Sequence, residues 1–221
     1  KFSMKCSLIP HNRFIDHFNS YAVPLEKLKA FLELDYKEKF IDFCEFLSAR
    51  KIFGSLEADS LFFSTIIKPF IFDNKEEVTQ DILMEMRSII NQPENKSTDY
   101  IDFKESQWGF RTINLFYTIM RIFYELREPN LYLTNLKLIE LLPDYKYELK
   151  RLFNAFCTLN FFLNNYRLTV SYEDIVHLKY LKNTSIFMGK SNDDLLDDIF
   201  VNFEKVSTSI PMLLKGIGLN L

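Results

Sequence analysis

The sequence predicts an all-α protein, a single multi-helix bundle of about eight or nine helices. Three observations lead to this prediction. Apolar residues recur at i, i+3, i+4 and i+7 in many segments, which is the spacing of one helix face. Side chains that favour helix starts precede several of these segments. Glycine is scarce, with 5 residues in 221, and no Asn-Gly or Asp-Gly pair is present to close a tight β-hairpin.

The first part of the chain is expected to form three helices, at residues 35–53, 55–72 and 73–91. Asp35 and Glu38 stand three residues apart at the start of the first helix, which is the spacing of a capping box. Asp73 and Glu76 repeat that spacing at the start of the third helix. Pro69 should kink or end the second helix, because it lacks an amide donor and clashes with the preceding turn.

A polar stretch without periodicity, residues 91–106, follows these helices and contains Pro93. The segments on both sides are too apolar to stand alone. We therefore interpret the stretch as a long surface loop within one domain of residues 1–221, with residues 1–23 as an N-terminal arm. No strand is expected anywhere in the chain.

The second part of the chain is expected to form five helices, at residues 110–126, 135–142, 144–165, 172–183 and 192–206. The sequence Arg-Glu-Pro-Asn at residues 127–130 should end the first of these, since the residue before a proline avoids helical geometry. Thr134 is the expected cap of the second. Ser171 and Asp174 have capping-box spacing before the fourth, and Ser191 is the expected cap of the last.

Charge and cysteine content limit the classes of partner and compartment. The net charge of −3 and the lack of a basic helix face argue against direct nucleic-acid binding by this segment. No apolar run approaches the ~18 residues that span a bilayer, so no membrane partner is expected. Cys6, Cys44 and Cys157 are widely separated, which is typical of a reducing, intracellular compartment. We interpret Cys44 and Cys157 as small buried apolar side chains.

No motif predicts catalysis, a cofactor or a metal. The sequence has no glycine-rich phosphate loop and no Gly-x-Ser-x-Gly elbow, so we expect no enzyme activity. His11 and His17 stand further apart than the paired ligands of structural zinc sites. We interpret His177 as a histidine at the core edge or surface of a helix. An acidic cluster begins the last expected helix and is interpreted as a solvated face that can meet a basic partner: Asp193, Asp194, Asp197 and Asp198.

The stretch FRTINLFYTIMRIFYEL, which begins at Phe110, resembles a core helix of the telomere repeat-binding-factor homology domain. The segments NLKLIELL and YELKRLFNAFCTLNFFLNN are similar in type and order to the next two helices of that family. The resemblance covers residues 110–181. It implies an all-helical homodimerisation domain that docks short peptides of partner proteins in grooves between helices. It also implies a nuclear, telomeric protein whose DNA contact is made by a separate Myb-type domain. The chain begins without Met, and we expect it to be a piece of such a longer protein.

A surplus of phenylalanine supports the expectation of a symmetric dimer, because 23 Phe exceed what one face per helix can bury. The candidate interface residues are Phe40, Phe43, Leu47, Phe200 and Phe203. Ordinary core positions are the alternative for each of them. A helical scaffold, an adaptor or an effector unrelated to telomeres is the alternative function, and an enzyme with a site inside a helical bundle is the least favoured.

Overall fold

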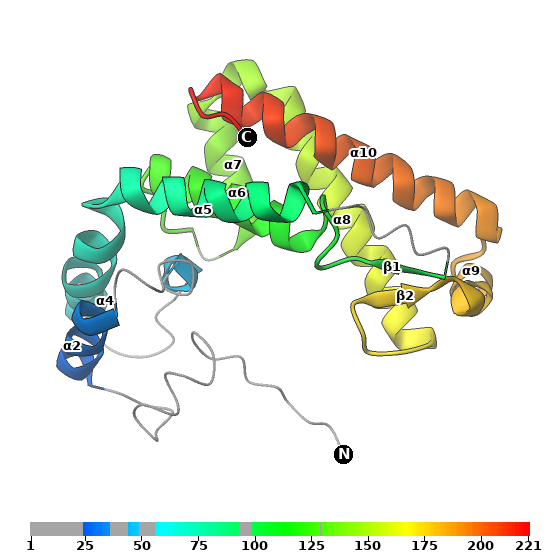
Figure 1. Cartoon of the computed structure of the whole chain (residues 1–221), viewed down its shortest axis with the longest axis horizontal. Coiled ribbons are helices and arrows are strands. Elements are labelled where there is room, and N and C mark those ends of the chain that lie inside the picture. The colour runs from blue at the N-terminus through cyan, green and yellow to red at the C-terminus, as the bar shows by residue number, and fades with distance from the viewer. Residues whose placement is uncertain (1–23, 36–43, 49–55, 93–98, 129) are drawn as a thin grey trace. The chain divides into compact units, whose positions relative to one another are not determined.

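The computed structural model describes residues 24–35, 44–48, 56–92, 99–128 and 130–221. Within these residues the fold is all-α, as predicted, with eight α-helices, short 3₁₀ and π segments and one small two-stranded sheet (Figure 1). The α-helices are α2 (Leu25–Asp35), α4 (Leu56–Phe62), α5 (Lys75–Ile90), α6 (Phe110–Phe123), α7 (Leu131–Leu141), α8 (Lys146–Thr169), α9 (Leu181–Met188) and α10 (Asn192–Gly216).

The remaining elements are short. The π-helix η3 covers Phe63–Phe72, and the 3₁₀ segments are η2 (Cys44–Ser48), η4 (Pro143–Tyr145) and η5 (Leu178–Tyr180). The strands are β1 (Tyr100–Asp102) and β2 (Ile175–His177). No described helix combines the length and the apolar character needed to cross a bilayer.

The chain divides into two compact units by its internal contacts. Unit 1 comprises Lys1–Ile82 and Thr118–Thr134, and unit 2 comprises Leu83–Tyr117 and Asn135–Leu221. Helices α5, α6 and α7 contribute residues to both units. The single domain expected for residues 1–221 stays a prediction.

Unit 1 contains η3, which contacts α2, η2 and α4. Pro69, which lies inside η3, was expected to kink or end the helix; it does not end it, because helical structure continues to Phe72, but the turns around it have π rather than α geometry. The wider π turn accommodates a proline that cannot donate a backbone hydrogen bond. The side-chain Nδ2 of Asn74 donates to the Pro69 carbonyl oxygen at 2.7 Å, and the Asp73 amide donates to the Lys68 oxygen at 2.9 Å. These bonds end η3 immediately before α5.

The expected helix at residues 35–53 lies largely outside the described residues. Asp35 is the last residue of α2, and its expected capping-box partner Glu38 lies outside the described residues. Within the described part of this range, η2 is a 3₁₀ segment, and its Cys44 and Leu47 are buried.

Unit 2 is organised by α8 and α10, which run beside each other along much of their length (Figure 1). The wide apolar face predicted on α8 comprised Leu149, Leu152, Phe153, Phe156, Leu159 and Phe162 or Leu163. Leu149, Leu152, Leu159, Phe162 and Leu163 are buried, whereas Phe153 and Phe156 are half-buried. Helix α10 buries a matching stripe that includes Leu195, Ile199, Val206, Ile210 and Leu214. Burial of these two faces removes apolar surface from water and stabilises this unit.

Of the caps expected at the starts of α7 and α10, one is confirmed. Ser191 caps α10 as predicted, since its Oγ accepts a hydrogen bond from the Asp194 amide at 3.1 Å. In α7 the prediction is wrong: the helix begins at Leu131, and Asn130 Oδ1 accepts from the Leu133 amide at 3.0 Å. Thr134 instead lies inside the helix, in the part of it that belongs to unit 1, and is buried.

The sheet contradicts two expectations. Residues 100–102, inside the expected loop, pair antiparallel with residues 175–177, inside the expected helix at residues 172–183. Ile101 is opposite Val176 in this register. Ile and Val fit a half-buried pleated surface, and tertiary pairing therefore overrides the weak helical pattern of residues 172–183. Asp174 caps no helix there; its carboxylate pairs with Arg167.

The cysteines differ in exposure. Cys44 is buried, as expected, whereas Cys157 is exposed on α8 and its expected burial is wrong. Cys157 lies on the opposite side of α8 from the buried stripe. Residues that are adjacent in the sequence point to different sides of a helix, so apolar neighbours do not imply burial. Burial of part of the Cys157 side chain still raises the pKa of its thiol.

Candidate functional site

Three helices of unit 2 surround a hollow lined mainly by apolar side chains. Helix α9 ends at Gly189, whose φ of 66° lies in the left-handed region that glycine adopts without strain. The chain then turns through Lys190 into α10, which starts at the Ser191 cap. This tight connection holds α9 against the first turns of α10 and the second half of α8. The hollow between them is hereafter the α8–α9–α10 groove.

The groove has a volume of about 360 Å³. Buried apolar side chains of α8 and α10 form its floor: Leu159, Phe162, Leu195 and Ile199. Two neutral polar residues of α8, Thr158 and Asn165, also line it. A hollow of this size with an apolar floor is typical of a site that accepts one or two large side chains of a ligand or partner.

Two aromatic side chains at the groove are exposed to solvent. Phe161 of α8 is 63% exposed and Phe187 of α9 is 61% exposed. Ile186, next to Phe187 on α9, is 69% exposed. Large apolar side chains that gather around a concave surface are costly to leave in water, and they commonly mark a protein interaction site.

Charged residues lie at the end of the groove where α10 begins. Lys190 and Asp198 both line the groove and form an ion pair with each other. The Ser191 hydroxyl donates to the Asp194 carboxylate at 2.7 Å. The acidic cluster expected from the sequence lies on the first turns of α10, but of its four residues only Asp198 lines the groove. Among the described residues no group of three His, Cys, Asp or Glu side chains is arranged to hold a metal ion.

A second, more polar hollow of about 440 Å³ lies at the end of α8. His177 lines it, on strand β2 rather than on a helix as expected. Its Nε2 is 3.9 Å from the Glu173 carboxylate, and its backbone amide donates to the Tyr166 hydroxyl at 3.1 Å. The Tyr166 hydroxyl thus fixes the strand against α8, which is a structural role.

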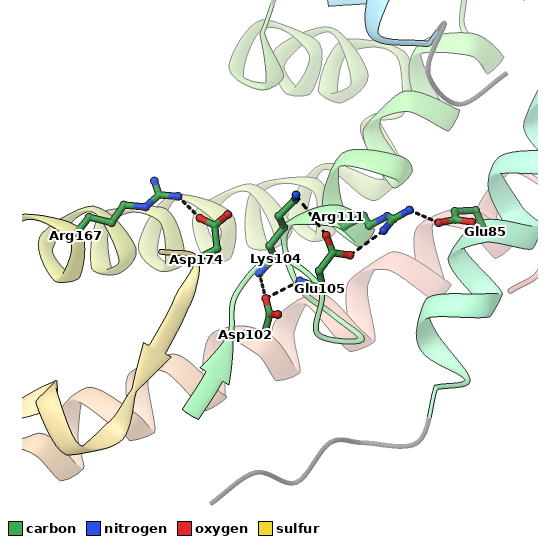
Figure 2. Close-up of polar contacts among 7 residues, drawn as sticks. All are labelled: Glu85, Asp102, Lys104, Glu105, Arg111, Arg167 and Asp174. Carbon is green, nitrogen blue, oxygen red and sulfur yellow. Dashed lines mark hydrogen bonds and ion pairs between the residues drawn. The ribbon is translucent and has the colours of Figure 1, made fainter. Parts of the chain in front are cut away.

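A chain of ion pairs holds the segment between β1 and α6 (Figure 2). Asp102 Oδ1 accepts from the amides of Lys104 and Glu105, at 2.9 and 2.8 Å. The Arg111 guanidinium lies between Glu85 and Glu105 and donates to both carboxylates, to Glu105 at 2.8 Å. Burial opposes ionisation of Glu105, but the hydrogen bonds and charges of Arg111 and Lys104 outweigh it and lower the pKa of Glu105. These contacts orient the segment between β1 and α6.

The candidate interface residues from the sequence lie in different surroundings. Leu47 is buried in unit 1, and Phe203 of α10 packs its ring 5.4 Å from that of Phe103 in unit 2. Phe200 is 55% exposed on α10. Phe40 and Phe43 lie outside the described residues, as do the N-terminal residues considered for a metal: Cys6, His11 and His17.

Sequence reasoning missed the two aromatic residues of the groove rim. Phe161 lies outside the buried stripe of α8, whereas its neighbour Phe162 belongs to the stripe and is buried. A large aromatic residue outside the apolar stripe of a helix was the one sequence feature that could have indicated this exposed position. Phe187 lies beyond the helix expected at residues 172–183, so no helix face was predicted for it. Its exposure depends on where α9 lies in the fold.

The fold and the groove define an all-α protein with an exposed, helix-lined apolar groove. No protein-family model, curated protein or solved structure compared with this chain matches it.

Proposed function

We propose that the chain is a non-catalytic helical domain that forms a homodimer and docks segments of partner proteins, within a larger telomere-binding protein of the nucleus. The observation that carries the docking function is the α8–α9–α10 groove, with Phe161 and Phe187 exposed beside a buried apolar floor. Homodimerisation and the telomeric context rest on the resemblance of residues 110–181 and on the abundance of phenylalanine.

Sedimentation equilibrium tests the dimer. A chain of 26.4 kDa is expected to sediment at twice that mass at micromolar concentration. Phe200→Glu should give a folded monomer, because a charge at an exposed interface position opposes association but not folding. Phe203→Glu is the matched change at a half-buried position, and it should destabilise the domain, because Phe203 packs on the buried Phe103. A wild-type chain that stays monomeric at high micromolar concentration contradicts the dimer.

Two DNA experiments test the telomeric context. The isolated chain should not shift a telomeric duplex at physiological ionic strength, because its net charge of −3 offers no counterion release. Immunoprecipitation of the full-length protein from cross-linked chromatin should enrich telomeric repeats. Lack of enrichment would favour the second candidate, a helical scaffold or adaptor without a telomeric role, which the groove supports equally well.

A further inference from the structure

We propose that Ser171 is a phosphorylation site for a protein kinase that selects serines followed by acidic residues. This inference is independent of the docking function proposed above. In the reaction, Ser171 Oγ forms a bond to the γ-phosphorus of ATP, and the bond from that phosphorus to the β–γ bridging oxygen breaks. The hydroxyl proton passes to a carboxylate of the kinase, and the products are phosphoserine and ADP.

Two serines of the chain have the acidic spacing that such a kinase reads. Ser171 begins the sequence Ser-Tyr-Glu-Asp, and Ser191 begins the sequence Ser-Asn-Asp-Asp. No other Ser or Thr in the sequence is followed by Asp or Glu three positions later. Carboxylates beside the acceptor serine attract a kinase whose substrate groove is basic. The two serines share this chemistry, and the structure distinguishes between them.

Ser171 lies in a turn that is accessible to an enzyme. Helix α8 ends at Thr169, and strand β2 begins at Ile175. Within the described part of the chain, residues 171–173 take part in no backbone–backbone hydrogen bond, and the intervening Tyr172 is 90% exposed. Ser171 lines the second, more polar hollow, and its Oγ accepts only a long bond of 3.4 Å from the backbone amide two residues on. The turn can therefore extend into a kinase active site without breaking a backbone hydrogen bond.

Ser191 is held by the start of α10. Its hydroxyl donates to the Asp194 carboxylate at 2.7 Å and accepts from the Asp194 amide at 3.1 Å. Its carbonyl oxygen accepts from the Leu195 amide at 3.2 Å, and the three residues that follow it belong to the first turn of the helix. Phosphate transfer to Ser191 would require the cap and this turn to open together, so Ser171 is the favoured acceptor.

A phosphate on Ser171 would add negative charge beside an existing ion pair. Arg167, in the last turn of α8, pairs with the Asp174 carboxylate, and the Asp174 carbonyl oxygen accepts from the Phe103 amide at 2.9 Å. The Arg167 Nε is buried and has no hydrogen-bond partner among the described residues, so the guanidinium has a donor to offer a phosphate. The phosphate would repel the carboxylates of the turn and compete with Asp174 for Arg167. We therefore expect the hydrogen bond from the Phe103 amide to open more often.

Phosphorylation of the full chain tests the site. The chain is incubated with ATP and a purified acidophilic serine/threonine kinase of the casein-kinase type, then digested with trypsin and analysed by fragmentation mass spectrometry. Phosphate should appear in the peptide of residues 168–179, at Ser171, at least about tenfold faster than at Ser191. Ser171→Ala should abolish this signal, and Ser191→Ala should leave it unchanged. Equal rates at the two serines would overturn the proposal.

Two further measurements separate the sequence from the fold and the test tube from the cell. Synthetic peptides of residues 166–180 and 186–200 should both accept phosphate, because they share the acidic spacing. A folded chain that takes no phosphate at Ser171 while its peptide does would overturn the proposal. Phosphopeptides enriched from cells that produce the protein should include residues 168–179 with phosphate on Ser171. Detection of this peptide only in the unmodified form would likewise contradict the site.

Amide hydrogen exchange tests the effect on the turn. The Phe103 amide should exchange at least about threefold faster in the phosphorylated chain than in the unmodified chain. Ser171→Ala treated with the same kinase is the control and should exchange like the unmodified chain. Unchanged exchange in a chain that carries the phosphate would overturn the competition for Arg167 and leave the phosphorylation site itself supported.

Discussion

The ring of Phe103 stacks on the ring of Phe162, with centroids 5.3 Å apart and planes inclined by 24°. Phe103 also lies 6.1 Å from Phe110 and 5.4 Å from Phe203, measured between ring centroids. It is fully buried. A residue from the segment expected to be a surface loop therefore joins α6, α8 and α10 in the core of unit 2.

Phe103→Ala should destabilise the protein by about 3–5 kcal/mol, because it removes a large side chain and leaves a cavity among three other rings. Urea denaturation followed by circular dichroism measures the change. Phe161→Ala, at a site that is 63% exposed, is the matched control and should change stability by less than about 0.5 kcal/mol. Equal costs for the two variants would contradict the position of Phe103 in the core.

Ser191→Ala should cost about 1 kcal/mol, because the Asp194 amide then loses its side-chain acceptor at the start of α10. Ser191→Asn keeps an oxygen acceptor and should retain most of the stability. The same denaturation measurement compares the three proteins. If Asn and Ala are equally destabilising, the hydrogen bond is not the source of the effect.

Arg111→Met should destabilise the protein by less than about 1 kcal/mol at neutral pH, because the guanidinium is partly exposed and screened by solvent. The pKa of Glu105 is lowered in the folded protein. The ionised Glu105 side chain therefore contributes to the free energy of unfolding above the ordinary glutamate pKa of about 4.3. This contribution is lost as the pH falls through the lowered pKa. The difference between wild type and Arg111→Met should thus shrink between pH 6 and pH 3. Denaturation at a series of pH values checks this, and a difference that grows on acidification would contradict it.

Cys157 should react with a thiol reagent in the folded protein, whereas Cys44 should react after unfolding, because Cys157 is exposed and Cys44 is buried. The raised pKa of Cys157 lowers its thiolate fraction, so the reaction at pH 8 should be several-fold slower than that of a cysteine peptide. Its rate should keep rising above pH 9. Cys6→Ser is included in all samples, and Cys157→Ser should abolish the native-state reaction. Rapid modification of the folded Cys157→Ser variant would show that another thiol is accessible and would contradict the burial of Cys44.

Local chemistry was enough to predict the helices whose signals lie within a few residues. The serine at position 191, followed by Asp193 and Asp194, predicted the start of α10, because a cap and the helix dipole act over one turn. The apolar period of residues 144–165 predicted α8 and most of its buried face. The scarcity of glycine predicted the all-α class, since it removes the turns that small sheets need.

Tertiary contacts decided what the sequence pattern could not. Strands β1 and β2 pair residues more than seventy positions apart, and neither is long enough to show an alternating pattern of its own. The weak helical period of residues 172–183 gave way to that pairing. The groove depends likewise on how α9 meets α8 and α10: the neighbours Phe161 and Phe162 have the same chemistry, and packing alone buries one and exposes the other. The sequence by itself therefore determined the helical class and the long helices, whereas the fold decided which aromatic residues form a surface.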